Sequence, residues 1–206
     1  MKEIFYDWGG GNVWLFHFIN DVRGDCLDKF MLLGTALGEH ALFPLYLGLA
    51  VILGLSGVVT TPTSDPLRHK NRAIVWFAAI AVFALSYFLD GLLISALKPF
   101  LDFPRPPLAL PQGTLHIIGE PEYHHSLPSG HSSFAMLVVA SLWPVLSSVW
   151  RMAGSFFVIW VGISRISLGA HFPADVAAGF VSSLAIVLLT YMTIQVLIRV
   201  QAGKIR

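Results

Sequence analysis

Five long apolar stretches dominate the pattern of hydrophobic and polar positions along this chain, and each holds at most one charged residue. A helix needs about 20 mostly apolar residues to cross the hydrocarbon core of a bilayer. The pattern therefore predicts five membrane-spanning helices. They cover residues 41–59, 73–97, 132–150, 152–170 and 176–198, with Asp90 as the charge in the second and Arg165 as the charge in the fourth.

The N-terminal region follows a different pattern. Residues 12–20 and 27–38 are apolar pieces that are too short to span a bilayer, and a charged stretch separates them. We interpret them as interfacial or re-entrant helices, with a sixth span as the alternative. The predicted fold class is an all-α, multi-pass transmembrane helical bundle of five to six spans. It divides into N-terminal interfacial helices, residues 1–40, and a single bundle domain, residues 41–206.

Composition agrees with a membrane protein. Hydrophobic residues make up 55% of the 206 positions and charged residues only 12%, whereas soluble domains carry about 25% charged residues. We therefore expect the lipid bilayer as the surroundings of this chain and no nucleic-acid partner. The single cysteine, Cys26, excludes an intramolecular disulfide, and the sequence leaves the oligomeric state open.

Loop charges predict the orientation in the membrane. Lysine and arginine are enriched in cytoplasmic loops, and basic residues here cluster at three places that the alternation of spans puts on one side. Residues 98–131 and 170–175 then lie together on the opposite, extracytoplasmic side of an inner membrane. The residues assigned to the cytoplasm are Arg68, Lys70, Arg72, Arg151, Arg199, Lys204 and Arg206.

Three segments on the extracytoplasmic side carry unusual chemistry. The first begins at Lys98 and reaches Arg105 seven residues later, in a run whose prolines prevent a regular helix and stiffen the chain. Two cations held in a stiff loop suit an anion. The alternative is that Lys98 and Arg105 anchor a helix end at the interface.

The second segment, Pro128-Ser129-Gly130-His131, stands where the third predicted span begins. Proline followed by serine signals a helix start, and the first N–H groups of a helix lack internal partners and attract anions. The segment therefore predicts an anion site beside a histidine. An ordinary helix cap with an interfacial histidine is the alternative.

The third segment contains Ser164-Arg165, then His171 and Asp175. An unpaired charge near the end of an apolar helix is expensive, so Arg165 is expected to serve a function. Pro173 suits the first position of the last span, which puts Asp175 in its first turn. A carboxylate that holds one ring nitrogen of His171 leaves the other free to attack. A snorkelling arginine and an interfacial histidine are the alternative.

These three segments together resemble the three-part signature of the type 2 phosphatidic acid phosphatase superfamily, which also contains vanadium haloperoxidases and glucose-6-phosphatase. The match runs in order from residue 98 to residue 175, and the flanking spans agree with the helical bundle of that family. The N-terminal region fits less clearly, because not all of the usual six spans are evident. The resemblance implies a metal-independent phosphatase without a cofactor.

The resemblance also implies a role for each motif residue. His171 attacks phosphorus to form a phosphohistidine and is oriented by Asp175, while His131 protonates the leaving oxygen and then activates water. Cations and a helix N-terminus stabilise the charge on the transferring phosphoryl group, and two histidines in opposite protonation states predict a bell-shaped pH profile. The phosphate-binding residues would be Lys98, Arg105, Ser129, Gly130 and Arg165.

The predicted function is hydrolysis of a lipid phosphomonoester or diphosphate. Undecaprenyl diphosphate, phosphatidylglycerol phosphate, phosphatidic acid and lipid A phosphate are the candidate substrates, with a polyprenyl diphosphate or a phospholipid phosphate favoured. One alternative is a protein that binds or transports a lipid phosphate without hydrolysis, which leaves the histidines unexplained. The other is a haloperoxidase-like vanadate site, which five spans disfavour.

Two further features concern groups outside the motifs. Asp90 lies within the second span, where a carboxylate usually has a partner. We expect it to pair with Arg165 or Lys98 or else to be a protonated buried acid.

His124 and His125, with Glu120 and Glu122 nearby, lack the spacing of a metal site. We interpret them as a solvated loop, with a contact to the lipid headgroup as the alternative.

Overall fold

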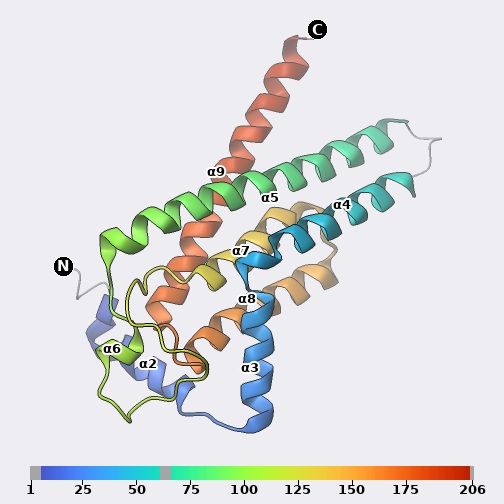
Figure 1. The fold of residues 1–206 in the computed structure, drawn as a ribbon. Coiled ribbons are helices and arrows are strands. Elements are labelled where there is room, and N and C mark those ends of the chain that lie inside the picture. The colour runs from blue at the N-terminus through green and yellow to red at the C-terminus, as the bar shows by residue number, and fades with distance from the viewer. Residues whose placement is uncertain (1–5, 61–65, 205–206) are drawn as a thin grey trace.

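The computed structural model describes residues 6–60 and 66–204, and all regular secondary structure in this part of the chain is helical, without strands (Figure 1). The longer helices are α2 (Gly11–Asn20), α3 (Asp25–Leu37), α4 (Phe43–Val59), α5 (Pro66–Leu101), α7 (Gly130–Leu142), α8 (Ser148–Ser167) and α9 (Pro173–Lys204). The short ones are α6 (Pro106–Ala109) and the 3-10 turns η1 (Trp8–Gly10), η2 (His40–Leu42) and η3 (Trp143–Val145).

Among the described residues, four helical segments are long and apolar enough to cross a membrane, which confirms the multi-pass helical bundle. Their outward faces are apolar as well: Ile52, Phe88 and Leu189 each keep more than 60% of their surface exposed. Such faces suit lipid rather than water. The four segments are His40–Val59, Leu67–Ala109, Ser148–Ser167 and Pro173–Val200.

The third predicted span, residues 132–150, differs from the prediction. Its α-helix, α7, ends at Leu142, and Pro144 lies in the following 3-10 turn. Proline lacks the N–H that would continue the α-helical ladder, so the chain turns and α8 begins at Ser148, four residues earlier than residue 152, where the next span was expected. The apolar run 132–150 is therefore divided between two antiparallel helices.

Helix α7 is the centre of the bundle, and α5, α8 and α9 all pack on it (Figure 1). Gly179 of α9 faces its first turn: a Cβ there would lie 2.6 Å from the Ser129 carbonyl oxygen and 3.1 Å from the Ser133 nitrogen. Only glycine permits this backbone contact. Behind it, the main core cluster joins α5, α7 and α9 through Val82, Phe83, Phe134, Leu137, Val138 and Val187.

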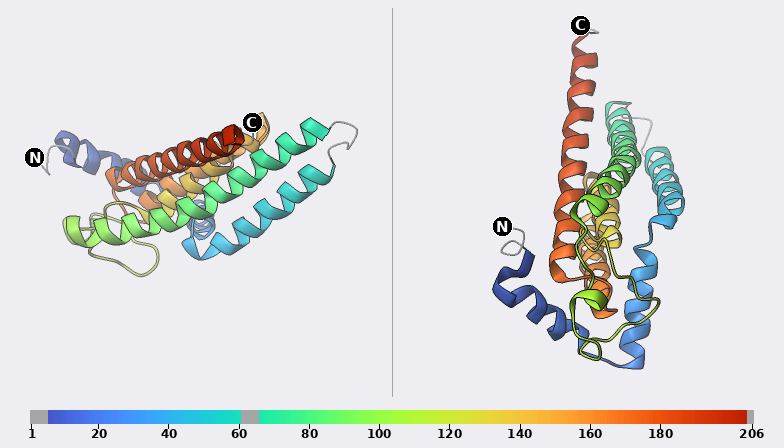
Figure 2. Two further views of the ribbon diagram at one scale, coloured as in Figure 1. Left: turned by 90° about the horizontal axis from the view of Figure 1, so that it is seen from above. Right: turned by 60° about the vertical axis from the view of Figure 1, so that its left-hand side comes forward.

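The N-terminal helices α2 and α3 lie at the end of the bundle that carries the loop between α6 and α7, as the right-hand view of Figure 2 shows. Buried Asn20 ties α2 to that loop and to the end of α8, because its side-chain amide donates to the carbonyls of His116 and Ser167, both at 2.9 Å. Neither helix is among the candidate spans. The division into residues 1–40 and 41–206 stays a prediction.

The contact at Gly179 leads to a stability prediction. We expect Gly179→Ala to lower the stability of the bundle by about 1–3 kcal/mol, the usual cost of overpacking a tight site, because backbone atoms must move to admit the methyl group. Thermal unfolding in detergent measures the effect. Gly48→Ala in α4 is the matched control, since a Cβ there meets nothing within 4 Å, and an equal loss in both variants would contradict the prediction.

Candidate active site

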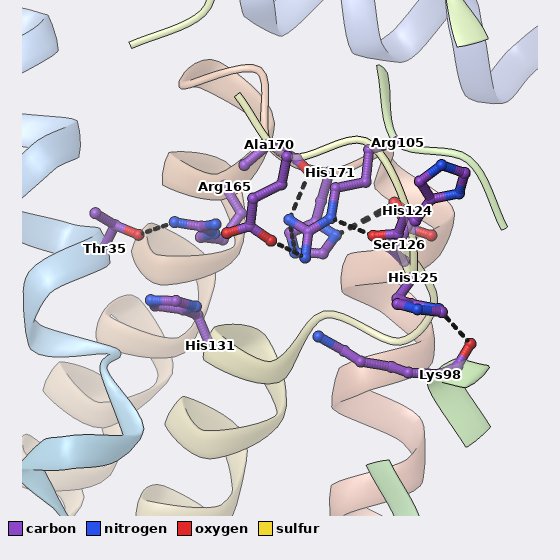
Figure 3. A network of polar contacts seen from close by, with 12 residues as sticks. Thr35, Lys98, Arg105, His124, His125, Ser126, His131, Arg165, Ala170 and His171 are labelled. Carbon is purple, nitrogen blue, oxygen red and sulfur yellow. Dashed lines mark hydrogen bonds and ion pairs between the residues drawn. The ribbon is translucent and has the colours of Figure 1, made fainter. Parts of the chain in front are cut away.

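A cavity of about 310 Å³ opens at the end of the bundle that carries the α6–α7 loop. Residues from the three sequence segments meet here, although they come from α5, the following loop, the start of α7, α8 and the turn before α9. Figure 3 shows the side chains of Arg105, Arg165 and His171 gathered at this point. Six predicted site residues line the cavity: Lys98, Arg105, Gly130, His131, Arg165 and His171.

The other two predicted residues, Ser129 and Asp175, lie behind the cavity wall and are fully buried. The Ser129 hydroxyl accepts a hydrogen bond from the Ser132 hydroxyl at 3.0 Å, and the Ser129 backbone N–H donates to the Asp175 carbonyl at 3.0 Å. The structure thus gives Ser129 a role in joining the starts of α7 and α9. Ser129 and Gly130 were both predicted to bind phosphate at this helix start, and of the two only Gly130 borders the cavity.

His171 and Asp175 form the predicted pair, with the His171 Nδ1 and the Asp175 Oδ2 3.5 Å apart. Ser126 connects them, because its hydroxyl donates to the Asp175 carboxylate and lies 3.4 Å from the His171 Nδ1. The carboxylate also accepts from the Phe172 N–H at 2.8 Å and from the Tyr6 hydroxyl at 2.9 Å. Asp175 is therefore held rigidly behind the ring, which leaves the Nε2 of His171 to face the cavity.

Arg105 lies against this free nitrogen, with its Nη1 3.3 Å from the His171 Nε2. The guanidinium is buried, and it donates to the carbonyls of His124 at 3.0 Å and Ala170 at 3.3 Å. Its Nη2 pairs with Glu122. These contacts fix a cation beside the candidate nucleophile, where an incoming phosphoryl oxygen would need it.

The protonation of His171 follows from these surroundings. Burial lowers the pKa of His171 well below its usual value, and the positive charges of Arg105, Arg165 and Lys98 lower it further. The neutral ring is the form that carries a free lone pair. We assign its proton to Nδ1, beside Asp175, so that Nε2 is the basic nitrogen.

Arg165 approaches the cavity from α8 and donates from Nη1 to the Thr35 hydroxyl of α3 (Figure 3). Lys98 reaches the cavity from the last turn of α5. The third cation comes from the loop that follows α5, so three positive side chains on separate elements surround one small space. An anion is the ligand that such a space favours.

His131, the second residue of α7, has a contact that the sequence did not predict. Its Nε2 lies 2.9 Å from the Glu39 Oε2, and the neighbouring His40 lines the same cavity. Thr35, Glu39 and His40 belong to or adjoin the N-terminal segment that had no predicted part in the site. No local signal marks them, because Glu39 and His131 are 92 positions apart.

The predicted pairing of Asp90 with Arg165 or Lys98 is wrong. Asp90 is buried on α5, and its two carboxylate oxygens lie 2.8 and 2.7 Å from the Ser133 hydroxyl of α7. Its side chain points across the α5–α7 contact rather than along α5 toward the cavity. The hydrogen-bond partner of this side chain in the structure is thus a hydroxyl and not a cation.

The loop histidines agree with the solvated interpretation. His124 and His125 are both exposed, and the Nδ1 of His125 lies 3.1 Å from the Asp102 carboxylate. Within residues 6–60 and 66–204, no three side chains of histidine, cysteine, aspartate or glutamate are grouped as metal ligands would be.

The amino-acid sequence of this chain is similar to a known protein family and to several known proteins. The family model of the PAP2 superfamily matches residues 75–199. The bacitracin transport permease protein BcrC of Bacillus licheniformis is 30% identical over 198 residues, which cover 88% of this chain and 80% of that protein. The lipid A 1-phosphatase of Rhizobium johnstonii is 32% identical over 117 residues, or 54% of this chain and 46% of that protein.

The chain spans about half the length of the lipid A 1-phosphatases that it matches. Two crystal structures share its fold. LpxE from Aquifex aeolicus superposes with a TM-score of 0.68 at 24% identity and covers 87% of this chain and 93% of its own. A PAP2-type phosphatidylglycerolphosphate phosphatase from Bacillus subtilis superposes with a TM-score of 0.64 at 24% identity, covering 91% and 86%.

The surroundings of His171 predict its titration. We expect His171 to titrate below pH 6.5, and we expect Lys98→Met to raise its pKa, because one of the cations that disfavour the charged ring is removed. Burial remains in the variant, so the pKa stays below its usual value. Histidine NMR signals in detergent, assigned with His171→Gln, follow the titration.

Lys29→Met on α3 is the control for a general loss of positive charge, because Lys29 is exposed and is not among the groups that shift His171. A His171 titration at or above pH 6.5, or an equal shift in the control, would contradict this account of the site.

Proposed function

Because the chain belongs to the PAP2 superfamily, we propose that it is an integral-membrane phosphatase that hydrolyses a phosphate ester or diphosphate of a lipid without a metal ion. One observation carries the proposal. The Nε2 of buried His171 faces a small cavity beside Arg105, while Asp175 holds the opposite nitrogen. A neutral, oriented imidazole next to a fixed cation is the arrangement that attack on a phosphate requires.

In the first chemical step, the Nε2 of His171 attacks phosphorus and the bond from phosphorus to the leaving oxygen breaks. His131 gives its proton to that oxygen, so the lipid product leaves as an alcohol or as a monophosphate. Lys98, Arg105 and Arg165 neutralise charge on the remaining phosphoryl oxygens, which is the main demand of phosphoryl transfer. Three cations meet this demand in place of a metal.

The second step returns the enzyme to its starting state. His131, now neutral, takes a proton from a water molecule as that water attacks the phosphohistidine. The bond from phosphorus to Nε2 breaks, phosphate leaves, and His171 regains its lone pair. Asp175 keeps its charge through both steps and stabilises the Nδ1–H of the ring.

The cavity walls support a lipid substrate. Besides the charged groups, Gly91 and Ile94 of α5 line the cavity, and they belong to a helix whose outer face is apolar. The headgroup would bind among the cations while the tail stays in the bilayer. The names of the lipid A 1-phosphatase and phosphatidylglycerolphosphate phosphatase relatives agree with this class, and we favour a polyprenyl diphosphate or a phospholipid phosphate.

We place the site on the extracytoplasmic face of an inner membrane. The support is the charge of the loops: the end of α4, the start of α5 and the turn between α7 and α8 lie away from the cavity (Figure 1), and Arg68, Lys70, Arg72 and Arg151 belong to that side. The positive-inside rule assigns such a side to the cytoplasm.

Transport or binding without hydrolysis is the second candidate, because the similar BcrC protein is named a bacitracin transport permease. A binding protein would need the three cations. It would have no use for His171 as a neutral base backed by Asp175, so the geometry favours hydrolysis. A vanadate-binding site like that of the haloperoxidases would use the same residues and is disfavoured by the membrane bundle.

The proposed function predicts phosphate release by purified protein in detergent with EDTA present, measured on a panel of lipid phosphates. We expect His171→Ala to abolish release and His131→Ala to reduce it by about 10²–10⁴-fold, the usual contribution of a general acid. His17→Ala on α2 is the matched control and should retain activity.

A phosphohistidine at residue 171, trapped by rapid quenching at alkaline pH and located by mass spectrometry, would identify the intermediate. Lipid binding without release of phosphate by the folded wild type would favour the transport candidate instead.

A further inference from the structure

The segment that joins α3 to α4, residues 38–42, brings two side chains to the cavity from outside the region that the family model matches, residues 75–199. We call this segment the α3–α4 elbow. It contains Glu39, which contacts His131, and His40, which lines the cavity. The elbow precedes the three motif segments by more than fifty positions, so neither the motifs nor their spacing assigns it a role.

The elbow is packed closely on the catalytic end of the bundle. A Cβ at Gly38 would lie 2.5 Å from the Val161 Cγ1 of α8, and a Cβ at Gly130 would lie 3.2 Å from the Cε1 of His40. Glycine at both positions lets the elbow touch α8 and the start of α7. The side chain of Glu39 therefore extends from a backbone that lies directly over the start of α7.

Two tyrosine hydroxyls hold the backbone of this region. Tyr46 donates to the Leu37 carbonyl at 2.9 Å, and Tyr87 donates to the His40 carbonyl at 3.4 Å. One of these tyrosines lies on α4 and the other on α5. The two bonds bracket Glu39 on both sides, so its position is set by the fold rather than by a free loop.

The contact between Glu39 and His131 is short and direct, with 2.9 Å between the carboxylate Oε2 and the ring Nε2. The carboxylate is 52% exposed, whereas the imidazole is 21% exposed. Glu39 is thus the more exposed partner of the two and contacts the ring from its solvent side. With Nε2 engaged by Glu39, Nδ1 is the nitrogen left for proton transfer to a leaving group.

The other surroundings of His131 destabilise the protonated form of its ring, which is the form that a general acid needs. Burial lowers the pKa of His131, and positive charge from several elements lowers it further. An anion in contact with the ring counters this effect. The charged and titratable groups that face His131 are Arg165 from α8, Lys98 from α5, Arg105 and Glu122 from the α5–α7 loops, His171 from the α8–α9 turn, and Glu39 and His40 from the elbow.

We propose that Glu39 is the positioning residue of His131, holding the ring in place and stabilising its protonated form as Asp175 holds His171. Each histidine then has its own carboxylate, one supplied within the motifs and one by the α3–α4 elbow. Glu39 keeps its charge throughout: the proton moves from His131 to the leaving oxygen, and the water later returns one to His131. This inference rests on the proposed function, since it assigns a partner to its general acid.

The test compares the pH dependence of kcat in the wild type, Glu39→Gln and Glu39→Asp. Loss of the carboxylate makes His131 lose its proton at lower pH, so the basic limb of kcat should move down by about one pH unit in Glu39→Gln. Glu39→Asp should restore the limb in part, because the charge returns on a shorter side chain. KM should change little, since Glu39 is not assigned to phosphate binding.

Glu120→Gln is the matched control, because it removes another exposed carboxylate from the loop side of the site. It should leave the basic limb unchanged. A purely structural role would lower kcat at all pH values and reduce thermal stability without moving the limb. An unmoved limb in folded Glu39→Gln, or an equal movement in Glu120→Gln, overturns the proposal.

A second measurement separates this inference from the proposed function. The NMR titration of His131 should shift to lower pH in Glu39→Gln even in a preparation without turnover. If the wild type releases no phosphate but the titration shifts, the function fails and the pairing stands. If the wild type is active and neither the titration nor the basic limb shifts, the pairing fails and the function stands.

Discussion

The backbone contact between the starts of α7 and α9 is the constraint on which the rest of the site depends. His131 lies in the first turn of α7 and Asp175 in the first turn of α9, and the Ser129 N–H joins the two helix starts by donating to the Asp175 carbonyl at 3.0 Å. Gly179 makes this approach possible because it leaves no side chain in the gap. Once these helix ends meet, the turn before α9 brings His171 to the cavity, and the distance between the two histidines is set by backbone geometry.

Charge is the second constraint. Lys98, Arg105 and Arg165 gather at the end of an apolar bundle, where charged side chains are costly unless they have partners. The two arginines have polar partners elsewhere in the chain: Glu122 pairs with Arg105, and the Thr35 hydroxyl accepts a hydrogen bond from Arg165. The site thus holds three positive charges close together. Burial lowers the pKa of His171, and these charges lower it further.

The N-terminal segment, which had no predicted part in the site, provides three contacts to the site residues. Tyr6 donates to the Asp175 carboxylate, Thr35 accepts from Arg165, and Glu39 contacts His131. Three regions before residue 40 therefore each hold one group of the candidate machinery. The motif region supplies the candidate reacting groups, and the N-terminal segment contacts them from outside the part that the family model matches.

The sequence by itself indicated the lipid surroundings of this protein, four of its spans and six of the residues that line the cavity. These follow from local physics, because a helix in lipid must be apolar over its length and because helix ends and motif spacing place groups at one face. The break at Pro144 has a local cause, the missing N–H of proline, although the apolar run concealed it. Only the tertiary structure decided that Asp90 pairs with Ser133 and that Tyr6, Ser126 and Glu39 support the histidines. These contacts join positions that are about 40 to 170 residues apart, and no periodicity or spacing along a chain encodes which distant surfaces will pack together.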